Sequence, residues 1–438
     1  MFSKKIVKAG LILCCLAALG AGAVVVFQWR FLVRRFWVYP QTGRALAALE
    51  SQRLPRPRED GLTDFRGVLH AHSYLSHDSM GTPEEMIRGA RNAAIDFVFL
   101  TDHHSNPQDR KAIEQGLRGG HSGVVFFPGV ETSPGLIAWF LDRAQLDGRL
   151  PLAGQIAQVQ AGGGVAFVCQ PDEPRPWEKL SGFAGMEIYN LHADAKKSRL
   201  TFYWRLSENF WSMSRYPMRV YHTLFHDPGD YLAIWDRLTQ QRPVVGIAGN
   251  DAHQTNGLRL VVTATGTLAL TDTSPKGRPL KEWNNWLARR VAGRYERGAT
   301  LWRWDADLYE RSYHFVNTHL LAPKKTPGDL RTALEAGHAY VGFDSLVTAS
   351  GFDFSYQGPG VKGLMGDQVR LEPGAVLEAQ APVPSLLRLI RNGQRITEQR
   401  GRSLRYPVEQ PGVFRVEAHL EVEGRLAPWI YANPIYIH

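Results

Sequence analysis

The sequence predicts an α/β fold, a distorted TIM-like β/α barrel, over residues 62–255. Two observations support this prediction. Near-continuous apolar strands alternate with helix-like stretches, which is typical of a buried parallel sheet. In addition, His, Asp and Glu residues recur where these strands end, and barrel enzymes carry their chemistry at the C-terminal ends of the strands.

The first strand, predicted over residues 65–69, ends at the pair His70-x-His72. In an extended chain, residues i and i+2 project to the same face, so both imidazoles can point at one spot. Such an arrangement suits a metal ion. Asp78 follows within a few residues. A His-x-His pair alone is a weak signal, and it gains weight from the other strand ends.

A strong helix start comes next. Thr82 is the predicted N-cap, Pro83 the first helical residue, and Glu85 completes a capping box. This helix runs to about residue 94. It leads into an apolar strand over residues 95–101, which ends in Asp102 and His103.

Four further predicted strands repeat this arrangement. The segment 124–127 precedes Glu131, 164–168 precedes Cys169-Gln170-Pro171, 186–189 precedes His192, and 244–248 precedes the Asp251-Ala252-His253 segment. The candidate metal ligands are therefore His70, His72, Asp78, His103, Glu131, His192, Asp251 and His253. Imidazole and carboxylate together suit Zn, Mn or Fe better than Ca or Mg. A carboxylate can bridge two such ions about 3.5–4 Å apart.

The N-terminus predicts a membrane anchor. Residues 9–27 form an uncharged run of 19 residues, close to the roughly 20 that span a bilayer. A cleaved signal peptide is the alternative, because Ala21-Gly22-Ala23 resembles a cleavage site. The apolar run continues past that site, which favours an uncleaved transmembrane helix. We expect a single-pass membrane protein with an extracytoplasmic catalytic domain.

The expected domains are an anchor over 1–30, a juxtamembrane linker over 31–61, a hydrolase domain over 62–344, and an antiparallel β-sandwich over 345–438. Aromatic-rich stretches at 195–240 and 276–313 interrupt the barrel, and we interpret both as helical insertions. The last segment has short alternating runs separated by Gly and Pro, which indicate antiparallel strands.

The charge distribution argues against a nucleic-acid partner. The whole chain has a formal net charge of +9. Residues 1–60 hold 10 Lys and Arg against 3 Asp and Glu, a net of +7, which leaves +2 for residues 61–438. The basic excess thus belongs to the predicted anchor and its flank, where basic residues meet anionic lipid. The remainder is nearly balanced.

Six segments together resemble the PHP (polymerase and histidinol phosphatase) domain in order and spacing. They are His70-x-His72, Ser76-His77-Asp78, Thr101-Asp102-His103, Gly129-Val130-Glu131, Glu187-Ile188-Tyr189-Asn190 and Asn250-Asp251-Ala252-His253. The resemblance covers roughly residues 62–260, with a weaker family-like stretch at 332–344. It implies a distorted barrel that holds two divalent ions, or three.

The resemblance also implies a ligand set. His70, His72, Glu131 and Asp251 would hold one ion, and Asp78, His103 and His253 another, while Glu131 would bridge to a third. The third ion normally takes a His in a His-Pro step, where this chain has Gln170-Pro171. Gln is a poor ligand for such metals. His192 is a possible substitute, although it lies outside the standard ligand positions.

The function expected from these features is metal-dependent phosphoester hydrolysis of a small phosphorylated substrate, with Asp251 and Glu131 as catalytic residues. The same chemistry could hydrolyse a carboxylic ester or amide, as in the amidohydrolases. A third hypothesis, from another class, is a membrane-tethered binding protein with a decayed metal site. Only Gln170 favours it, whereas seven ligand positions are intact.

Overall fold

The computed structural model describes residues 29–54, 58–103, 116–140, 146–171, 175–197, 199–224 and 228–438. Its first elements are a π-helical turn, η1 (Arg34–Val38), and α2 (Tyr39–Glu50). Tyr39 and Leu46 of α2 are buried, and the Tyr39 hydroxyl donates to Asn209 Oδ1 at 2.7 Å. Within the predicted linker, residues 34–50 are therefore a helix that packs on the folded body.

The predicted transmembrane helix and the single-pass membrane location are not supported and are corrected here. The apolar run at 9–27 lies outside the described residues. From residue 29 onward, no helix in the described ranges combines the length and the apolar character that crossing a bilayer requires.

The first strands form as predicted. Strand β1 (Thr63–Val68) pairs in parallel with β2 (Phe97–Phe99), which pairs in parallel with β5 (Val124–Phe127). A short strand, β4 (Gly119–His121), flanks β5. Between β1 and β2 lies α3 (Pro83–Asn92), and the predicted capping box of Thr82 and Glu85 is present. The first predicted strands and the predicted helix start are therefore present in the structure.

The other site-bearing strands lie in a second sheet. Its order is β10 (Val245–Gly249), β9 (Gly185–Asn190), β8 (Val165–Val168), β7 (Leu136–Trp139), β6 (Gly129–Thr132) and β3 (Asp102–His103). Strand β7, which the sequence analysis missed, is antiparallel to both of its neighbours. Helix α5 (Leu152–Ala161) connects β7 to β8.

The predicted TIM-like barrel is wrong: the fold is mixed α/β with large sheets. The strands that carry the site divide between two sheets, and an isolated parallel bridge between Ala71 and Ala252 links the chain after β1 to the chain after β10. On its other edge, β1 pairs antiparallel with β15 (Asn317–Ala322). In a closed barrel, another barrel strand would pair with this edge of β1. Here β15, from a later part of the chain, pairs with it instead.

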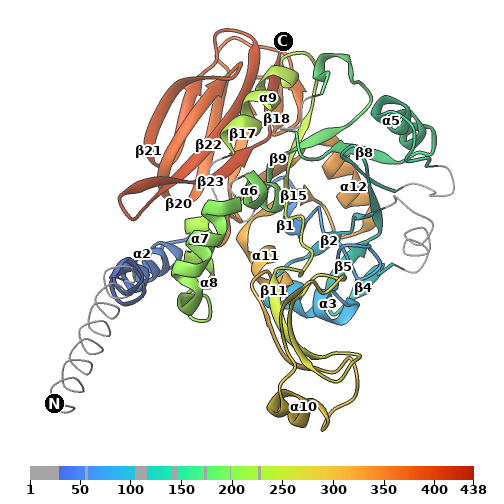
Figure 1. Ribbon diagram of the computed structural model, residues 1–438. Helices are drawn as coiled ribbons and strands as arrows, with labels where there is room; N and C mark the ends of the chain where they lie inside the picture. The colour runs from blue at the N-terminus through green and yellow to red at the C-terminus, as the bar shows by residue number, and fades with distance from the viewer. Residues whose placement is uncertain are drawn as a thin grey trace.

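Most pairs of C-terminal strands are antiparallel as predicted, yet these strands do not form a sheet separate from the body. Strand β16 (Ala339–Gly342) pairs with β15 on one side and with β23 (Arg425–Ala432) on the other. One 14-stranded sheet therefore runs from β1 into the C-terminal region (Figure 1). Its other members are β17 (Asp353–Gln357), β18 (Lys362–Leu364), β19 (Gln368–Val369), β20 (Val376–Arg391), β21 (Gln394–Pro407), β22 (Gly412–Val422) and β24 (Ile435–Ile437).

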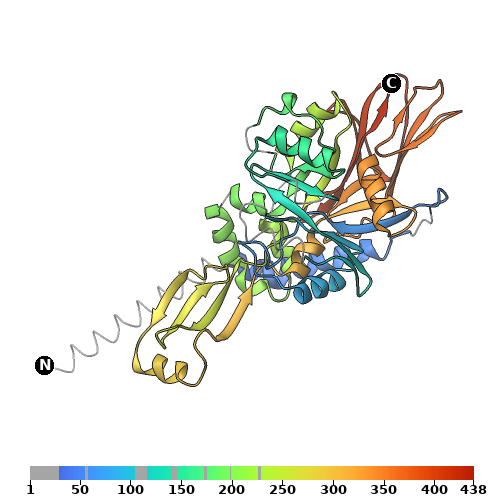
Figure 2. The same ribbon diagram turned by 90° about the vertical axis from the view of Figure 1, so that its right-hand side faces the viewer.

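The two insertions differ from each other. The described residues between 195 and 240 are mainly helical, as expected. The helices of this region are α6 (Leu191–Lys197), α7 (Arg199–Asn209), α8 (Pro217–Leu224) and α9 (Gly229–Thr239). The second insertion is mostly a four-stranded antiparallel sheet with one short helix. It consists of β11 (Gly257–Val262), β12 (Leu268–Asp272), β13 (Pro279–Trp283), α10 (Trp286–Ala292) and β14 (Thr300–Asp305). Figures 1 and 2 show it as an arm that projects from the body.

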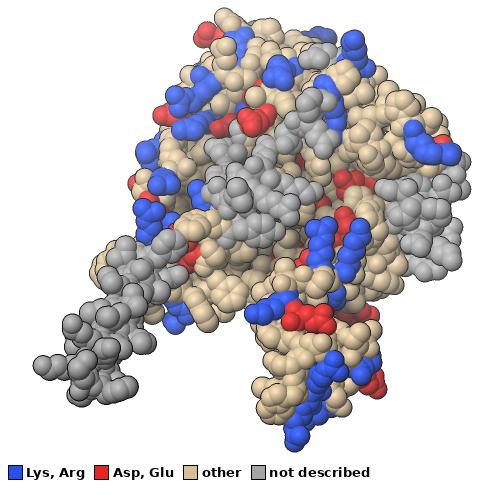
Figure 3. Space-filling model, viewed as in Figure 1, with Lys and Arg blue, Asp and Glu red and all other residues tan. Residues whose placement is uncertain are grey.

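Two helices and a buried core complete the body. Helix α11 (Tyr309–Phe315) packs on α3, and α12 (Pro327–Ala336) packs on β15. The core includes fully buried Trp139, Trp235 and Trp429. On the face shown in Figure 3, basic and acidic side chains are interspersed.

Candidate metal centre

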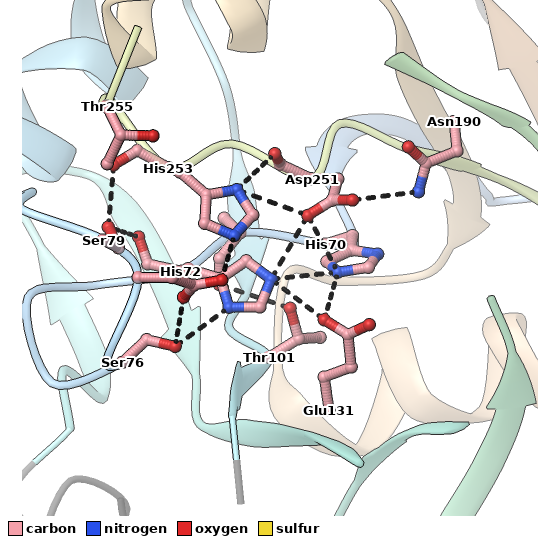
Figure 4. Close-up of polar contacts among 12 residues, drawn as sticks. His70, His72, Ser76, Ser79, Thr101, Glu131, Asn190, Asp251, His253 and Thr255 are labelled. Carbon is pink, nitrogen blue, oxygen red and sulfur yellow. Dashed lines mark hydrogen bonds and ion pairs between the residues drawn. The ribbon is translucent and has the colours of Figure 1, made fainter. Parts of the chain in front are cut away.

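The two histidines of the His-x-His pair meet two carboxylates. His70 and His72, which follow β1, are fully buried. Their Nε2 atoms lie 3.1 Å apart, and each lies 3.1 Å from Glu131 Oε2. Asp251 Oδ1 lies 3.4 Å from His70 Nε2 and 3.3 Å from His72 Nε2. Figure 4 shows these four side chains converging on one point. We call them the inner group.

A second set of ligand atoms adjoins the first. Asp78 Oδ2 lies 3.0 Å from His103 Nε2 and 3.2 Å from His253 Nε2. The His72 ring stacks on that of His253, with 4.1 Å between ring centroids. His72, Asp78, His103 and His253 thus form an outer group whose ligand atoms lie within 4.8 Å of one another. His72 belongs to both groups.

Neighbouring polar groups fix the orientation of the inner histidines. His70 Nδ1 lies 2.6 Å from Glu187 Oε1, and since a carboxylate only accepts, the proton of this hydrogen bond sits on Nδ1. His70 Nε2 is then left to face the inner group. His72 Nδ1 lies 3.3 Å from Ser76 Oγ, which donates to Asp78 Oδ1. Partners of this kind orient the ring of a metal-binding histidine and raise its basicity.

Glu187 is itself held on several sides. Its Oε2 accepts from Asn190 Nδ2 at 2.9 Å and from the backbone N–H of Gln170 at 3.0 Å. A Cβ atom at Gly249 on the neighbouring strand would collide with the Glu187 carboxylate. Gly249 therefore makes room for this carboxylate. The sequence alone suggests no specific role for Glu187; the signal available there is an acidic residue inside an apolar strand.

The inner group has strong electrostatic coupling. Burial opposes ionisation of Asp251, but the charges of His70, His192 and His253 outweigh it and hold the pKa of Asp251 well below its usual range. Burial likewise disfavours a charged His70, yet Asp251, Glu187 and Glu131 raise its pKa well above the ordinary value. The pKa of Glu131 is lowered for the same reason, mainly by His70 against the opposing effect of burial. The carboxylates thus stay ionised in a buried place.

A divalent cation fits this arrangement. Asp251 Oδ1 is buried and has no hydrogen-bond partner, although imidazole nitrogens of His70, His72 and His253 lie within 3.4 Å. Two imidazole nitrogens 3.1 Å apart that both face ionised carboxylates are the donor set of a transition-metal site. Asp251 also has a φ of 49°, a left-handed conformation that is uncommon outside glycine and that concentrates at functional sites.

Seven of the eight predicted ligands come together in these two groups. His192 is the exception: it belongs to neither group, although its ring centroid lies 5.0 Å from that of His253. Gln170 also stays outside, and its backbone contacts Glu187. Next to it, the buried Cys169 Sγ lies 3.5 Å from Glu131 Oε1. In the described part of the chain, no third group of ligand atoms forms around Glu131.

Asp102 orders the loop that follows His72. Its carboxylate accepts from the Ser73 backbone N–H at 2.6 Å and from Ser73 Oγ at 3.0 Å, and this holds the chain directly after His72. Arg175 donates to the carbonyl oxygen of Cys169 at 2.8 Å. The side chains of Lys196 and Lys197 lie outside the described residues.

Comparison with solved structures finds a structural likeness, whereas the other comparisons find no match. No family model matches the chain, and no match is found among curated proteins. Among solved structures, the chain is similar to a two-domain protein from Bacteroides vulgatus that contains a predicted PHP-like metal-dependent phosphoesterase. The two are 13% identical, the likeness covers 87% of this chain and 98% of that one, and the TM-score is 0.35. The case for a metal centre therefore rests on the geometry of the two groups.

Proposed function

We propose that the protein is a metal-dependent phosphoesterase of the PHP type that acts on a small phosphorylated substrate. The observation that carries the proposal is the pair of ligand groups that share His72. His70, His72, Glu131 and Asp251 would hold one divalent ion, and Asp78, His103 and His253 would hold a second beside it. Imidazole and carboxylate ligands favour Zn, Mn or Fe.

The metals would supply positive charge that lowers the pKa of water and neutralises charge on phosphate oxygens. The protein's own residues position and shield the reaction. The inner group is buried, so water reaches its atoms poorly, while the side chains of Asp78 and His103 are 37% and 19% exposed. A phosphate group would therefore approach from the outer group. Glu187 and Ser76 would keep His70 and His72 aimed at the site.

His192 is placed for a different task. It lines a pocket together with Asp251 and His253, yet it belongs to neither ligand group. An imidazole exchanges protons near neutral pH. We propose that His192 donates a proton to the alcohol oxygen that leaves the phosphorus atom, the role of a general acid.

The deciding experiment measures metal content and phosphatase activity on the same purified full-length chain. Bound metal is quantified, and turnover of a generic aryl phosphoester is assayed with added Mn²⁺ or Zn²⁺. We expect two ions per chain, and loss of both metal and turnover in Asp251→Asn. Asp367→Asn is the matched control, because Asp367 pairs with His338 at 2.9 Å, outside both groups, and it should retain both properties.

Other results would redirect the assignment. Bound metal without phosphoester turnover would point to the hydrolysis of carboxylic esters or amides. A chain that takes up no metal would contradict the proposal and leave a binding protein.

A further inference from the structure

A pocket opens directly beside the metal centre. Asp251 and His253, which Figure 4 shows next to each other, form part of its wall, together with His192. It has about 470 Å³ of empty space, part of which is continuous with solvent. A group attached to a phosphate at the metal centre could extend into it.

The opposite wall of the pocket is apolar. Helices α6, α7 and α8 and the turn between the last two contribute Leu191, Leu206, Met213, Tyr221 and Leu224. All except the partly exposed Leu206 are buried. The Tyr221 hydroxyl donates to the Ala306 carbonyl oxygen at 2.9 Å, so that Tyr221 offers its ring rather than a free hydroxyl to the pocket.

The remaining polar groups of the pocket do not suit an anion. Among the described residues that line it, none is Lys or Arg. The Asp307 carboxylate accepts from the backbone N–H groups of Thr255 and Asn256 and from Asn256 Nδ2, so backbone and amide donors already hold it. Asn250 Oδ1 is buried without a hydrogen-bond partner. It adds one acceptor to the pocket but no positive charge.

From this wall we infer that the substrate is a phosphomonoester of an alcohol with an uncharged, largely apolar group, which occupies the pocket while the phosphate lies at the metal centre. The inference rests on the proposed phosphoesterase function. It disfavours nucleotides, diphosphates and other substrates with a second anionic group on this side, because the described residues that line the pocket include no Lys or Arg to pair with it, and the two histidines among them are assigned to the metal centre and to the leaving oxygen.

The test compares alkyl phosphates whose leaving alcohols have similar acidity, so that differences report on the pocket rather than on the chemistry. The metal-loaded full-length chain is assayed with ethyl, hexyl and 5-carboxypentyl phosphate. Burial of four more methylene groups should raise kcat/KM for the hexyl over the ethyl ester on the order of 10- to 100-fold. The 5-carboxypentyl ester has a similar chain length but an anionic end, and it should lose most of this gain.

Two variants on one helix localise the effect. Leu206→Trp fills the pocket and should bring the hexyl-to-ethyl ratio close to one. Ser207→Trp adds the same bulk at the next position, which is exposed and does not line the pocket, and it should keep the ratio of the natural chain. Equal ratios in these two variants would overturn the inference.

A binding measurement separates the two proposals. Hexylphosphonate and ethylphosphonate cannot be hydrolysed, and their affinities for the metal-loaded chain are measured by calorimetry. Tighter binding of the hexyl compound with no turnover of any ester would support the pocket and refute the phosphoesterase function. Turnover without preference for the hexyl ester would support that function and refute the pocket assignment. Neither binding nor turnover would refute both.

Discussion

The substitution Glu187→Gln tests whether the carboxylate beside His70 prepares the metal site. It removes a charge while keeping the shape of the side chain. In the natural chain, Glu187 Oε1 accepts a hydrogen bond from His70 Nδ1–H, and Oε2 accepts from Asn190 Nδ2 and the Gln170 backbone N–H. Both oxygens are therefore acceptors that face donors.

A glutamine cannot satisfy both sides. If its amide NH₂ faces Asn190 and Gln170, donor meets donor in a fully buried place. If the NH₂ faces His70, Nδ1 must accept, and the imidazole proton of the neutral ring moves to Nε2, where it blocks the inner group. Loss of such a partner typically costs 10- to 100-fold in metal affinity or activity. That factor corresponds to roughly 1.4–2.7 kcal/mol.

The assay is competition for metal against a chelator of known affinity, with kcat/KM measured on the same samples. Thermal unfolding of the metal-free chain shows whether the variant is folded. Glu417→Gln is the matched control: Glu417 is also buried and pairs with Arg415 at 2.6 Å, away from the site. It should lose stability but keep its metal affinity. A folded Glu187→Gln chain with unchanged metal affinity would refute the reasoning.

Three further predictions follow from the same structure. Metal removal by a chelator should lower the melting temperature of the chain. Readdition of metal to a free concentration of about 100 times its dissociation constant should restore roughly 2.7 kcal/mol of unfolding free energy. A melting temperature that does not respond to metal would contradict the site. His192→Asn should keep its metal content and slow alkyl phosphates far more than aryl phosphates, whose leaving groups need no proton; equal slowing of both would argue against the general acid. Despite burial, Asp64 and Asp344 raise the pKa of His319 from 6.5 to about 9. Since the folded-state pKa lies above the unfolded value, this stabilisation is fully present below about pH 6.5, is lost as the pH rises through 9, and is on the order of 3 kcal/mol. The stability difference between the natural chain and His319→Gln, measured by denaturant unfolding, should therefore shrink from pH 6 to pH 10, and a constant difference would contradict this assignment.

Much of the candidate site was predictable from local patterns. The His-x-His pair follows a strand, and the alternation of side chains along an extended chain sends both imidazoles to one face. The capping box at Thr82 and Glu85 forms as predicted, because it depends on residues three apart. The metal ligands could be selected because His, Asp and Glu rarely end several apolar strands in a row by chance.

Other features of the site depend on contacts between distant parts of the chain. Glu187 lies next to His70 although 117 residues separate them, and no local pattern pairs a buried carboxylate with its partner. Similarly, the apolar wall of the pocket comes from helices after β9, and only packing brings Leu206 to the same pocket as Asp251. The predicted ligand role of His192 fails to appear in the geometry because its imidazole lies beside His253 rather than in either group.

By itself, the sequence determined which chemical groups the protein uses and on which strands they lie, because residue type and side-chain alternation are local properties. The tertiary structure decided how those strands combine. Antiparallel pairing of β1 with β15 and of β7 with its neighbours replaces a closed barrel by two large sheets. Strand pairing is set by long-range packing and hydrogen bonding. The alternation of side chains along one strand carries no information about which other strand it pairs with.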